Sequence, residues 1–234
     1  MFTSSQVIGI IVIAVITMFF STACIVLRRK GKSFEGMLCK FMASFGFISL
    51  AVFGNYLNEP NISYFSFVLV ALMFSFIGDI LLGIKEIAPT FKKKLIPLGM
   101  AYFLIAHIFS LCAFTMLEGF RWYLPVIGLC GGAIIFILCT KVLKLVINTK
   151  FIIVCSLYYS FLVWKLATAI RMFALAQTKA NGVILAAAIL FIISDTVLGL
   201  IYFSPIKKKK ELVTVELSTY YSAQILLAAT ILAV

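Results

Sequence analysis

Stretches of about 20 apolar residues follow one another along this chain, separated by short polar connections. A helix of about 20 residues spans the hydrocarbon core of a bilayer, and within lipid every backbone polar group needs an internal partner. The stretches therefore predict an all-α polytopic membrane protein, a single domain of eight transmembrane helices over residues 1–234. We expect these helices at residues 6–27, 38–57, 62–84, 97–117, 123–146, 151–173, 181–203 and 214–234.

The connections carry residues that end helices. Asn58-Glu59-Pro60 and the Glu118-Gly119 step are turn-like. Proline cannot continue a helix at its amide, so we expect three prolines to mark helix ends: Pro89, Pro97 and Pro205. The first apolar stretch is too long for the core of a signal peptide, and charge follows it instead of preceding it, so we interpret it as a helix.

Basic residues alternate between the connections. Sixteen of the 20 Lys and Arg residues lie in or beside the first, third, fifth and seventh connections, whereas the even ones hold Arg121, Arg171 and Lys179. Cytoplasmic loops are the ones enriched in Lys and Arg, so we expect the odd connections to be cytoplasmic and both termini to be non-cytoplasmic. The net charge of +12 then reflects basic loops, and nucleic acid is not an expected partner.

The six cysteines lie in or beside apolar stretches and form no Cys-x-x-Cys pair. We interpret them as small buried hydrophobic residues, without a disulfide or metal role. A bacterial inner membrane is the location we expect, with the endoplasmic reticulum as the alternative. The sequence leaves the oligomeric state open.

Two aspartates occupy near-identical apolar settings. Asp79 lies in Phe74–Gly83, FSFIGDILLG, and Asp195 lies in Phe191–Gly199, FIISDTVLG. An acid within a membrane helix costs free energy to insert, about 2.5–3.5 kcal/mol, and such residues commonly mark functional sites. We therefore predict that the rest of the chain brings Asp79 and Asp195 together.

Further polar residues are expected at a similar depth. From the predicted helix ends, His107, Tyr220 and Gln224 lie with both aspartates roughly 8–15 Å from the cytoplasmic boundary. Ala106-His107 follows Asp79 as Ala223-Gln224 follows Asp195, at 28 and 29 residues, which indicates a weak 4+4 parallel repeat. One histidine with two acids could bind a metal ion, but no second histidine or paired cysteine supports this, so we expect none.

Three residues from other helices complete the candidate set. Tyr158 and Lys165 share one helical face at i, i+7. Lys165 either extends to the outer interface or faces the carboxylates or a phosphate. Lys40 is expected to begin the second helix at the cytoplasmic surface, where it fits the basic-loop pattern.

Four motifs in order along the chain resemble the YhhN-like membrane family. They are Ile77-Gly78-Asp79-x-x-Leu82, Gly99-x-x-x-Phe103-x-x-Ala106-His107, Ser194-Asp195 and Tyr220-Tyr221-x-Ala223-Gln224. The resemblance covers essentially the whole chain, including the number of helices. It departs in the second helix, where the family tends to have Lys-Pro and this chain has Lys40-Phe41.

Characterised members of that family are lysoplasmalogenases. The resemblance implies an intramembrane hydrolase that cleaves the vinyl ether bond of a lysoplasmalogen, releasing a fatty aldehyde and a glycerophospho-alcohol without a cofactor. Asp79 and Asp195 would be catalytic. The residues expected to bind the lysophospholipid are His107, Lys165, Tyr158, Tyr220, Gln224 and Lys40.

Two other classes of protein stay open at this point. Repeated intramembrane acids also suit a proton-coupled transporter of small solutes or lipids, in which they would carry protons. A heptahelix-like receptor fits less well, because it predicts neither eight helices nor two acids within the membrane.

Overall fold

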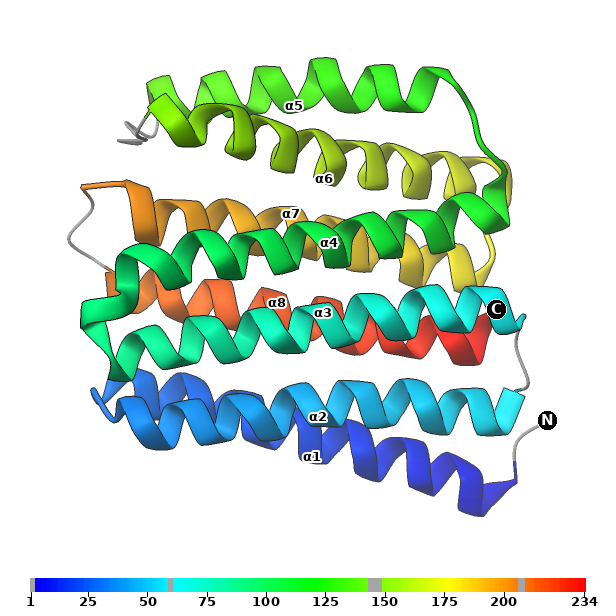
Figure 1. The fold of residues 1–234 in the computed structure, drawn as a ribbon. Helices are drawn as coiled ribbons and strands as arrows, with labels where there is room; N and C mark the ends of the chain where they lie inside the picture. The colour runs from blue at the N-terminus through cyan, green and yellow to red at the C-terminus, as the bar shows by residue number, and fades with distance from the viewer. Residues whose placement is uncertain (1–2, 59–60, 143–148, 206–208) are drawn as a thin grey trace. The chain divides into compact units, whose positions relative to one another are not determined.

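A computed structural model describes residues 3–58, 61–142, 149–205 and 209–234 (Figure 1). Over these residues the chain is all-helical, as predicted, with eight α-helices and one short 3-10 helix. Their bounds are α1 Ser4–Arg29, α2 Ser33–Asn58, α3 Ile62–Ile87, η1 Pro89–Phe91, α4 Lys92–Glu118, α5 Tyr123–Val142, α6 Thr149–Leu175, α7 Lys179–Phe203 and α8 Lys209–Ala233.

Seven of the helices in the described residues, α1 to α7, are long and apolar enough to cross a membrane. This confirms a multi-pass membrane protein. The eighth span is not confirmed, because the first half of α8 is polar and includes Lys210, Glu211 and Glu216. The orientation of the termini and the single domain stay predictions.

Several helix ends differ from the predicted ones. The prediction that Pro97 marks a helix end is wrong: α4 begins at Lys92, and Pro97 lies inside it. A proline close to a helix start removes only one backbone hydrogen bond, and the lysines before it favour helix. The Glu118-Gly119 break is confirmed, since α4 ends at Glu118 and Gly119 has φ 85°, which glycine adopts without steric cost. Residues 59–60 and 143–146 of the predicted elements lie outside the described residues.

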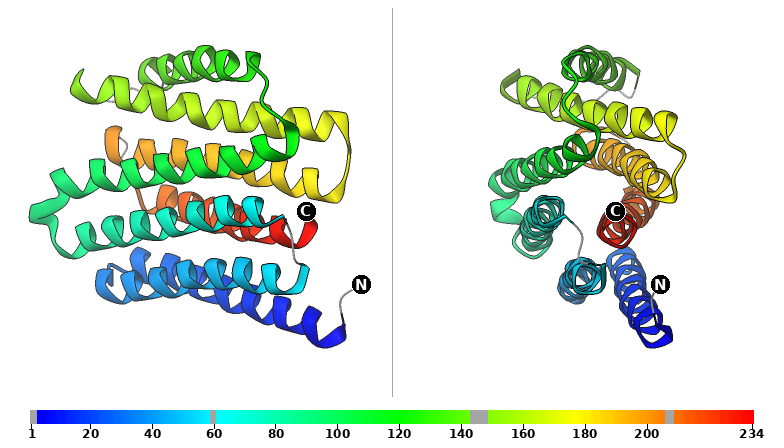
Figure 2. Two further views of the ribbon diagram at one scale, coloured as in Figure 1. Left: turned by 45° about the vertical axis from the view of Figure 1, so that its right-hand side comes forward. Right: turned by 90° about the vertical axis from the view of Figure 1, so that its right-hand side faces the viewer.

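The helices divide into two compact units. Unit 1 comprises Met1–Ala113 and Gln224–Val234, and unit 2 comprises Phe114–Ala223. In unit 1, α2 packs against both α1 and α3 (Figure 2). The last turns of α8 also belong to this unit: Tyr64 Oη donates to Thr230 Oγ1 at 2.7 Å, and Asn58 Nδ2 donates to the Ile231 carbonyl at 3.1 Å.

Small and aromatic residues bring α3 and α4 together within unit 1. A Cβ atom at Gly78 would lie 2.9 Å from the Phe103 ring, and one at Gly99 would lie 2.9 Å from Leu82 Cδ2. Beside this contact, the rings of Phe74 and Phe109 stack with centroids 5.8 Å apart. This close packing fixes the rotation of α3 and therefore the direction in which Asp79 points.

In unit 2, α6 packs against both α5 and α7. The approach of α5 to α6 is closest at Gly132, where a Cβ atom would lie 2.5 Å from both the Cα and the N of Ser160. Near the C-terminal end of α6, Arg171 forms an ion pair with Glu118 and lies over the Tyr123 ring. The middle and the C-terminal end of α6 are therefore held by specific contacts.

We predict that Gly132→Ala lowers the free energy of unfolding by about 1–3 kcal/mol, because the new methyl group meets the backbone of α6 and the helices must separate. Gly182→Ala in α7 is the matched control, since its Cβ would meet only Phe173 Cε2 at an ordinary 3.6 Å. Thermal unfolding of the purified variants in detergent measures both changes. Equal midpoints for Gly132→Ala and wild type would contradict the close approach.

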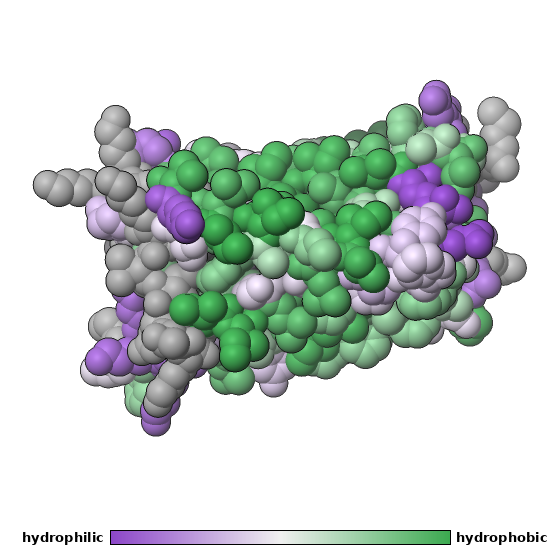
Figure 3. Space-filling model, turned by 90° about the horizontal axis from the view of Figure 1, so that it is seen from above, coloured by the Kyte–Doolittle hydropathy of each residue, from purple (hydrophilic) through white to green (hydrophobic). Residues whose placement is uncertain are grey.

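The outer surface of α5 is apolar, as expected for a lipid-facing helix. Val126, Leu129, Ile134 and Ile137 are each about half exposed or more. On the face that Figure 3 presents, hydrophobic side chains cover the middle and hydrophilic ones gather toward the helix ends. This distribution matches a bilayer, with its hydrocarbon core between two polar interfaces.

Candidate functional site

Asp79 is fully buried in α3 and is held by two side chains of α2. Lys40 Nζ forms an ion pair with Asp79 Oδ1 at 2.9 Å. Ser44 Oγ donates a hydrogen bond to Asp79 Oδ2 at 2.6 Å. Lys40 and Ser44 are one helical turn apart, so they reach the same partner from one face of α2. Each carboxylate oxygen therefore has its own contact on α2.

The expected place of Lys40 at the start of the second helix is wrong. Helix α2 begins at Ser33, so Lys40 lies two turns inside it and is 4% exposed. Pairing with Asp79 offsets the cost of burying the ammonium group. Sequence reasoning missed Ser44 altogether. The available signal was the i, i+4 spacing of Lys40 and Ser44 on the helix that precedes Asp79.

Asp195 is buried in α7 and contacts α6. Tyr158 Oη donates a hydrogen bond to Asp195 Oδ2 at 3.1 Å. Lys165 Nζ lies 3.9 Å from the centroid of the Phe191 ring, one turn before Asp195. The shared face of Tyr158 and Lys165 is thus confirmed as facing α7. Lys165 is fully buried and does not extend to the interface, which leaves the alternative in which it faces the carboxylates or a phosphate.

The two aspartates have equivalent positions within their own helices. Asp79 lies eight residues before Ile87, the end of α3, and Asp195 lies eight residues before Phe203, the end of α7. Each is therefore about 12 Å along the axis from the end of its helix. Each also contacts a polar side chain from the preceding helix. Asp79 belongs to unit 1 and Asp195 to unit 2, so their joint action and the 4+4 repeat stay predictions.

The remaining candidates are also buried. His107 in α4 and Tyr220 in α8 are each 4% exposed, and Gln224 in α8 is completely buried. Among the described residues, neither Nε2 nor Oε1 of Gln224 has a hydrogen-bond partner. A buried amide without partners costs about 1–3 kcal/mol. A polar group of a ligand beside Gln224 would recover that cost.

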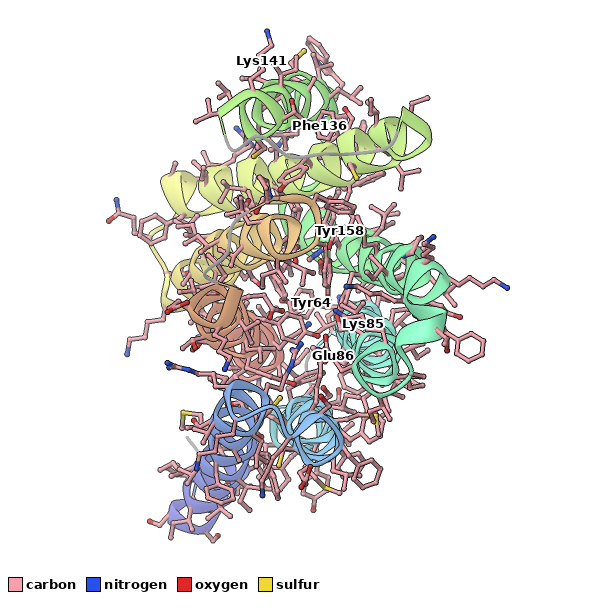
Figure 4. All side chains as sticks on the ribbon, turned by 90° about the vertical axis from the view of Figure 1, so that its left-hand side faces the viewer. Tyr64, Lys85, Glu86, Phe136, Lys141 and Tyr158 are labelled. Carbon is pink, nitrogen blue, oxygen red and sulfur yellow. The ribbon has the colours of Figure 1, made fainter. Side chains whose placement is uncertain are left out.

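A charged cluster at the end of α3 was not predicted. Arg28 Nη2 and Lys85 Nζ each lie 2.9 Å from the same oxygen of Glu86, Oε1. Figure 4 shows Lys85 and Glu86 at the end of α3 nearest the viewer. Sequence reasoning had counted Lys85 as a loop charge. In the parts of the chain that are described, no three His, Cys, Asp or Glu side chains are placed to hold a metal ion.

Comparison with known proteins places the chain in a family. A model of the YhhN family matches residues 36–231. The chain belongs to the YhhN family. No curated protein and no solved structure matches it. The resemblance stated from the four motifs is thereby confirmed.

The family match covers both aspartates of this YhhN protein together with their contacts. It begins four residues before Lys40 and ends beyond Gln224. Lys85 and Glu86 also lie inside the matched region, whereas Arg28 precedes it. Apart from Arg28, the polar groups described above therefore belong to the part of the chain that the family shares.

Proposed function

We propose that this YhhN family member hydrolyses the vinyl ether bond of lysoplasmalogens. The family is associated with lysoplasmalogenase activity. The observation that carries the proposal is the pair of buried aspartates, each oriented by a polar side chain of the preceding helix, Lys40 and Ser44 for Asp79 and Tyr158 for Asp195. Buried, oriented carboxyl groups are suited to transferring protons within a site shielded from water.

The reaction needs an acid and a base, and no redox change. A proton is added to the vinyl carbon that is distal to the ether oxygen, which leaves an oxocarbenium ion. Water then adds to the carbon beside the oxygen and loses a proton, giving a hemiacetal. The hemiacetal hydroxyl loses its proton, the bond to the glycerol oxygen breaks, and that oxygen takes up a proton. One water is consumed, and a fatty aldehyde and a glycerophospho-alcohol are released.

Asp79 and Asp195 would serve as this acid and base, acting on one substrate bond. An ionised carboxylate beside the oxocarbenium ion would also stabilise its charge. Gln224, His107 and Tyr220 would bind the polar part of the lipid. Lys165 would place a positive charge near Asp195. In this proposal Lys40 orients Asp79, which replaces its earlier assignment to substrate binding.

The deciding experiment supplies the purified protein with a lysoplasmalogen and measures release of fatty aldehyde. The matched control is the lysolipid with a saturated alkyl ether at the same position, which has no vinyl carbon to protonate. We expect aldehyde from the first substrate only. If no aldehyde forms, and vesicles containing the protein instead take up a solute in response to a proton gradient, the proton-coupled transporter is correct.

The orientation in the membrane is a separate proposal, with the basic odd connections in the cytoplasm. In a variant without the six native cysteines, Gln177→Cys should react with an impermeant thiol reagent added outside right-side-out vesicles or cells. Thr90→Cys, beside Lys92 and Lys93, should react only after the membrane is opened. Both positions are exposed, so access to the reagent depends on the side of the membrane. Labelling of Thr90→Cys in sealed membranes would reverse the orientation.

A further inference from the structure

The charged cluster at the end of α3 has features that its role in holding helices together does not explain. Lys85 is two residues from the end of the helix, yet its side chain is only 4% exposed. A lysine at that place ordinarily extends its ammonium group into water. Here the neighbouring Ile84 and Ile87 are 37% and 41% exposed, and the lysine is the residue turned inward. This rotation of the helix buries the charge of Lys85 and exposes the apolar side chains of Ile84 and Ile87.

Cations from three helices gather near this point. Arg28 comes from α1 and shares Glu86 Oε1 with Lys85. Lys40 comes from α2 and forms an ion pair with Asp79, six residues before Lys85 on α3. Cations gathered at a partly buried place repel one another, and an anion reduces that repulsion. Arginine and lysine together are also the side chains that most often bind phosphate oxygens.

The cluster is open to the outside, whereas Asp79 is not. The Glu86 side chain is 34% exposed, that of Arg28 is 16% exposed, and Asp79 is completely buried. Lys85 follows Asp79 by six residues on α3, a rise of about 9 Å. Helical side chains lean toward the N-terminal end of their helix, so Lys85 leans back toward Asp79. A glycerophosphate is of the right scale to extend from the cluster toward Asp79.

We propose that Arg28 and Lys85 form a binding site for a phosphate group, with Glu86 holding the two cations in place when the site is empty. The phosphate would be that of the lysolipid head group, and inorganic phosphate shares the same chemistry. The claim that this phosphate belongs to the substrate's head group rests on the proposed function. The claim that Arg28 and Lys85 bind phosphate can be tested without measuring turnover.

The test measures binding of two saturated ether lipids, which the protein cannot hydrolyse. One is a 1-alkyl-glycerophosphocholine and the other is a 1-alkyl-glycerol, identical except for the phosphate-bearing head group. Calorimetric titration in a maltoside detergent keeps other phosphate out of the sample. Lys85→Met and Arg28→Gln should each weaken binding of the phosphate lipid about 10- to 100-fold and leave binding of the alkylglycerol unchanged. Inorganic phosphate should compete with the lipid if the anion alone is sufficient, and not if the alkyl chain is required.

Three further variants separate a phosphate site from a purely structural cluster. Lys85→Arg should keep the affinity, because the charge is retained. Glu86→Gln should increase affinity for the phosphate lipid, because a competing carboxylate is removed, whereas a structural network would be weakened by the same change. Lys93→Met removes an exposed charge in the first turn of α4 and should change neither affinity.

The possible results are distinct. Equal losses for both lipids, or no loss for either, would overturn the phosphate site. If wild type binds the phosphate lipid, the variants lose that binding, and yet no aldehyde is released from a lysoplasmalogen, the site stands and the proposed hydrolase activity fails. If aldehyde is released while the variants bind as wild type does, the activity stands and the site fails.

Discussion

Asp79→Asn and Asp195→Asn are each expected to lower kcat for vinyl ether cleavage by a factor of about 10²–10⁴. An amide keeps the shape of the carboxyl group but cannot supply or accept the proton that the reaction moves. Because the two acids are proposed to act as a unit, the double variant should be little worse than the poorer single variant. Aldehyde release by purified protein measures all three variants, and Glu35→Gln is the control for loss of an exposed acid.

Asp79→Asn is also expected to lower the stability of the protein. Lys40 is buried against Asp79, so Asp79→Asn leaves an ammonium group without its anion and should lower stability by about 3–5 kcal/mol. Adding Lys40→Met should restore much of that loss without restoring activity. Rates therefore need to be expressed per folded molecule. Near-normal turnover in the single Asn variants would make the acids structural or ion-conducting and would favour the transporter.

Gln224→Leu is expected to have opposite effects on stability and on catalysis. The Gln224 amide is buried and has no hydrogen-bond partner in the described part of the chain, so an apolar side chain removes a desolvation cost and the midpoint of thermal unfolding should rise. If Gln224 bonds a polar group of the substrate, kcat/KM should fall about 10- to 100-fold through the loss of that hydrogen bond.

The exposed Gln177→Leu is the control for the same chemical change and should alter neither quantity. Unfolding in detergent and the aldehyde assay can be made on one preparation of each variant. A Gln224→Leu protein that is less stable and equally active would show that the amide has a structural role only.

The helical class and both aspartates could be predicted because their signals are local. An apolar run of about 20 residues and an acid within it are visible without knowledge of any contact. The starts of two helices were predicted too late: Ser33 to Met37 and Lys92 to Lys94 are helical although they lie outside the predicted helices. Charge alone does not tell whether a residue near the membrane surface is in a loop or in the first turns of a helix.

The partners of Asp79 could not be predicted, because they depend on which faces of the helices meet. Lys40 fits the basic-loop pattern by count, yet it is buried against Asp79. Ser44 carries no signal of its own, since a serine in a membrane helix usually bonds its own backbone. Lys85 was likewise assigned to a connection, although packing turns it inward toward Glu86. Tyr158 and Lys165 were predictable as a pair because their i, i+7 spacing is a property of one helix.

The way the chain divides into units has a consequence for biosynthesis. Unit 2 is continuous from Phe114 to Ala223, so all of its residues are available before synthesis of the chain is finished. Unit 1 also needs residues 224–234, whose Thr230 and Ile231 bond Tyr64 and Asn58. Domains generally fold in the order in which they are synthesised. Here α1 to α3 are synthesised first, but unit 1 stays incomplete until residues 224–234 have been synthesised.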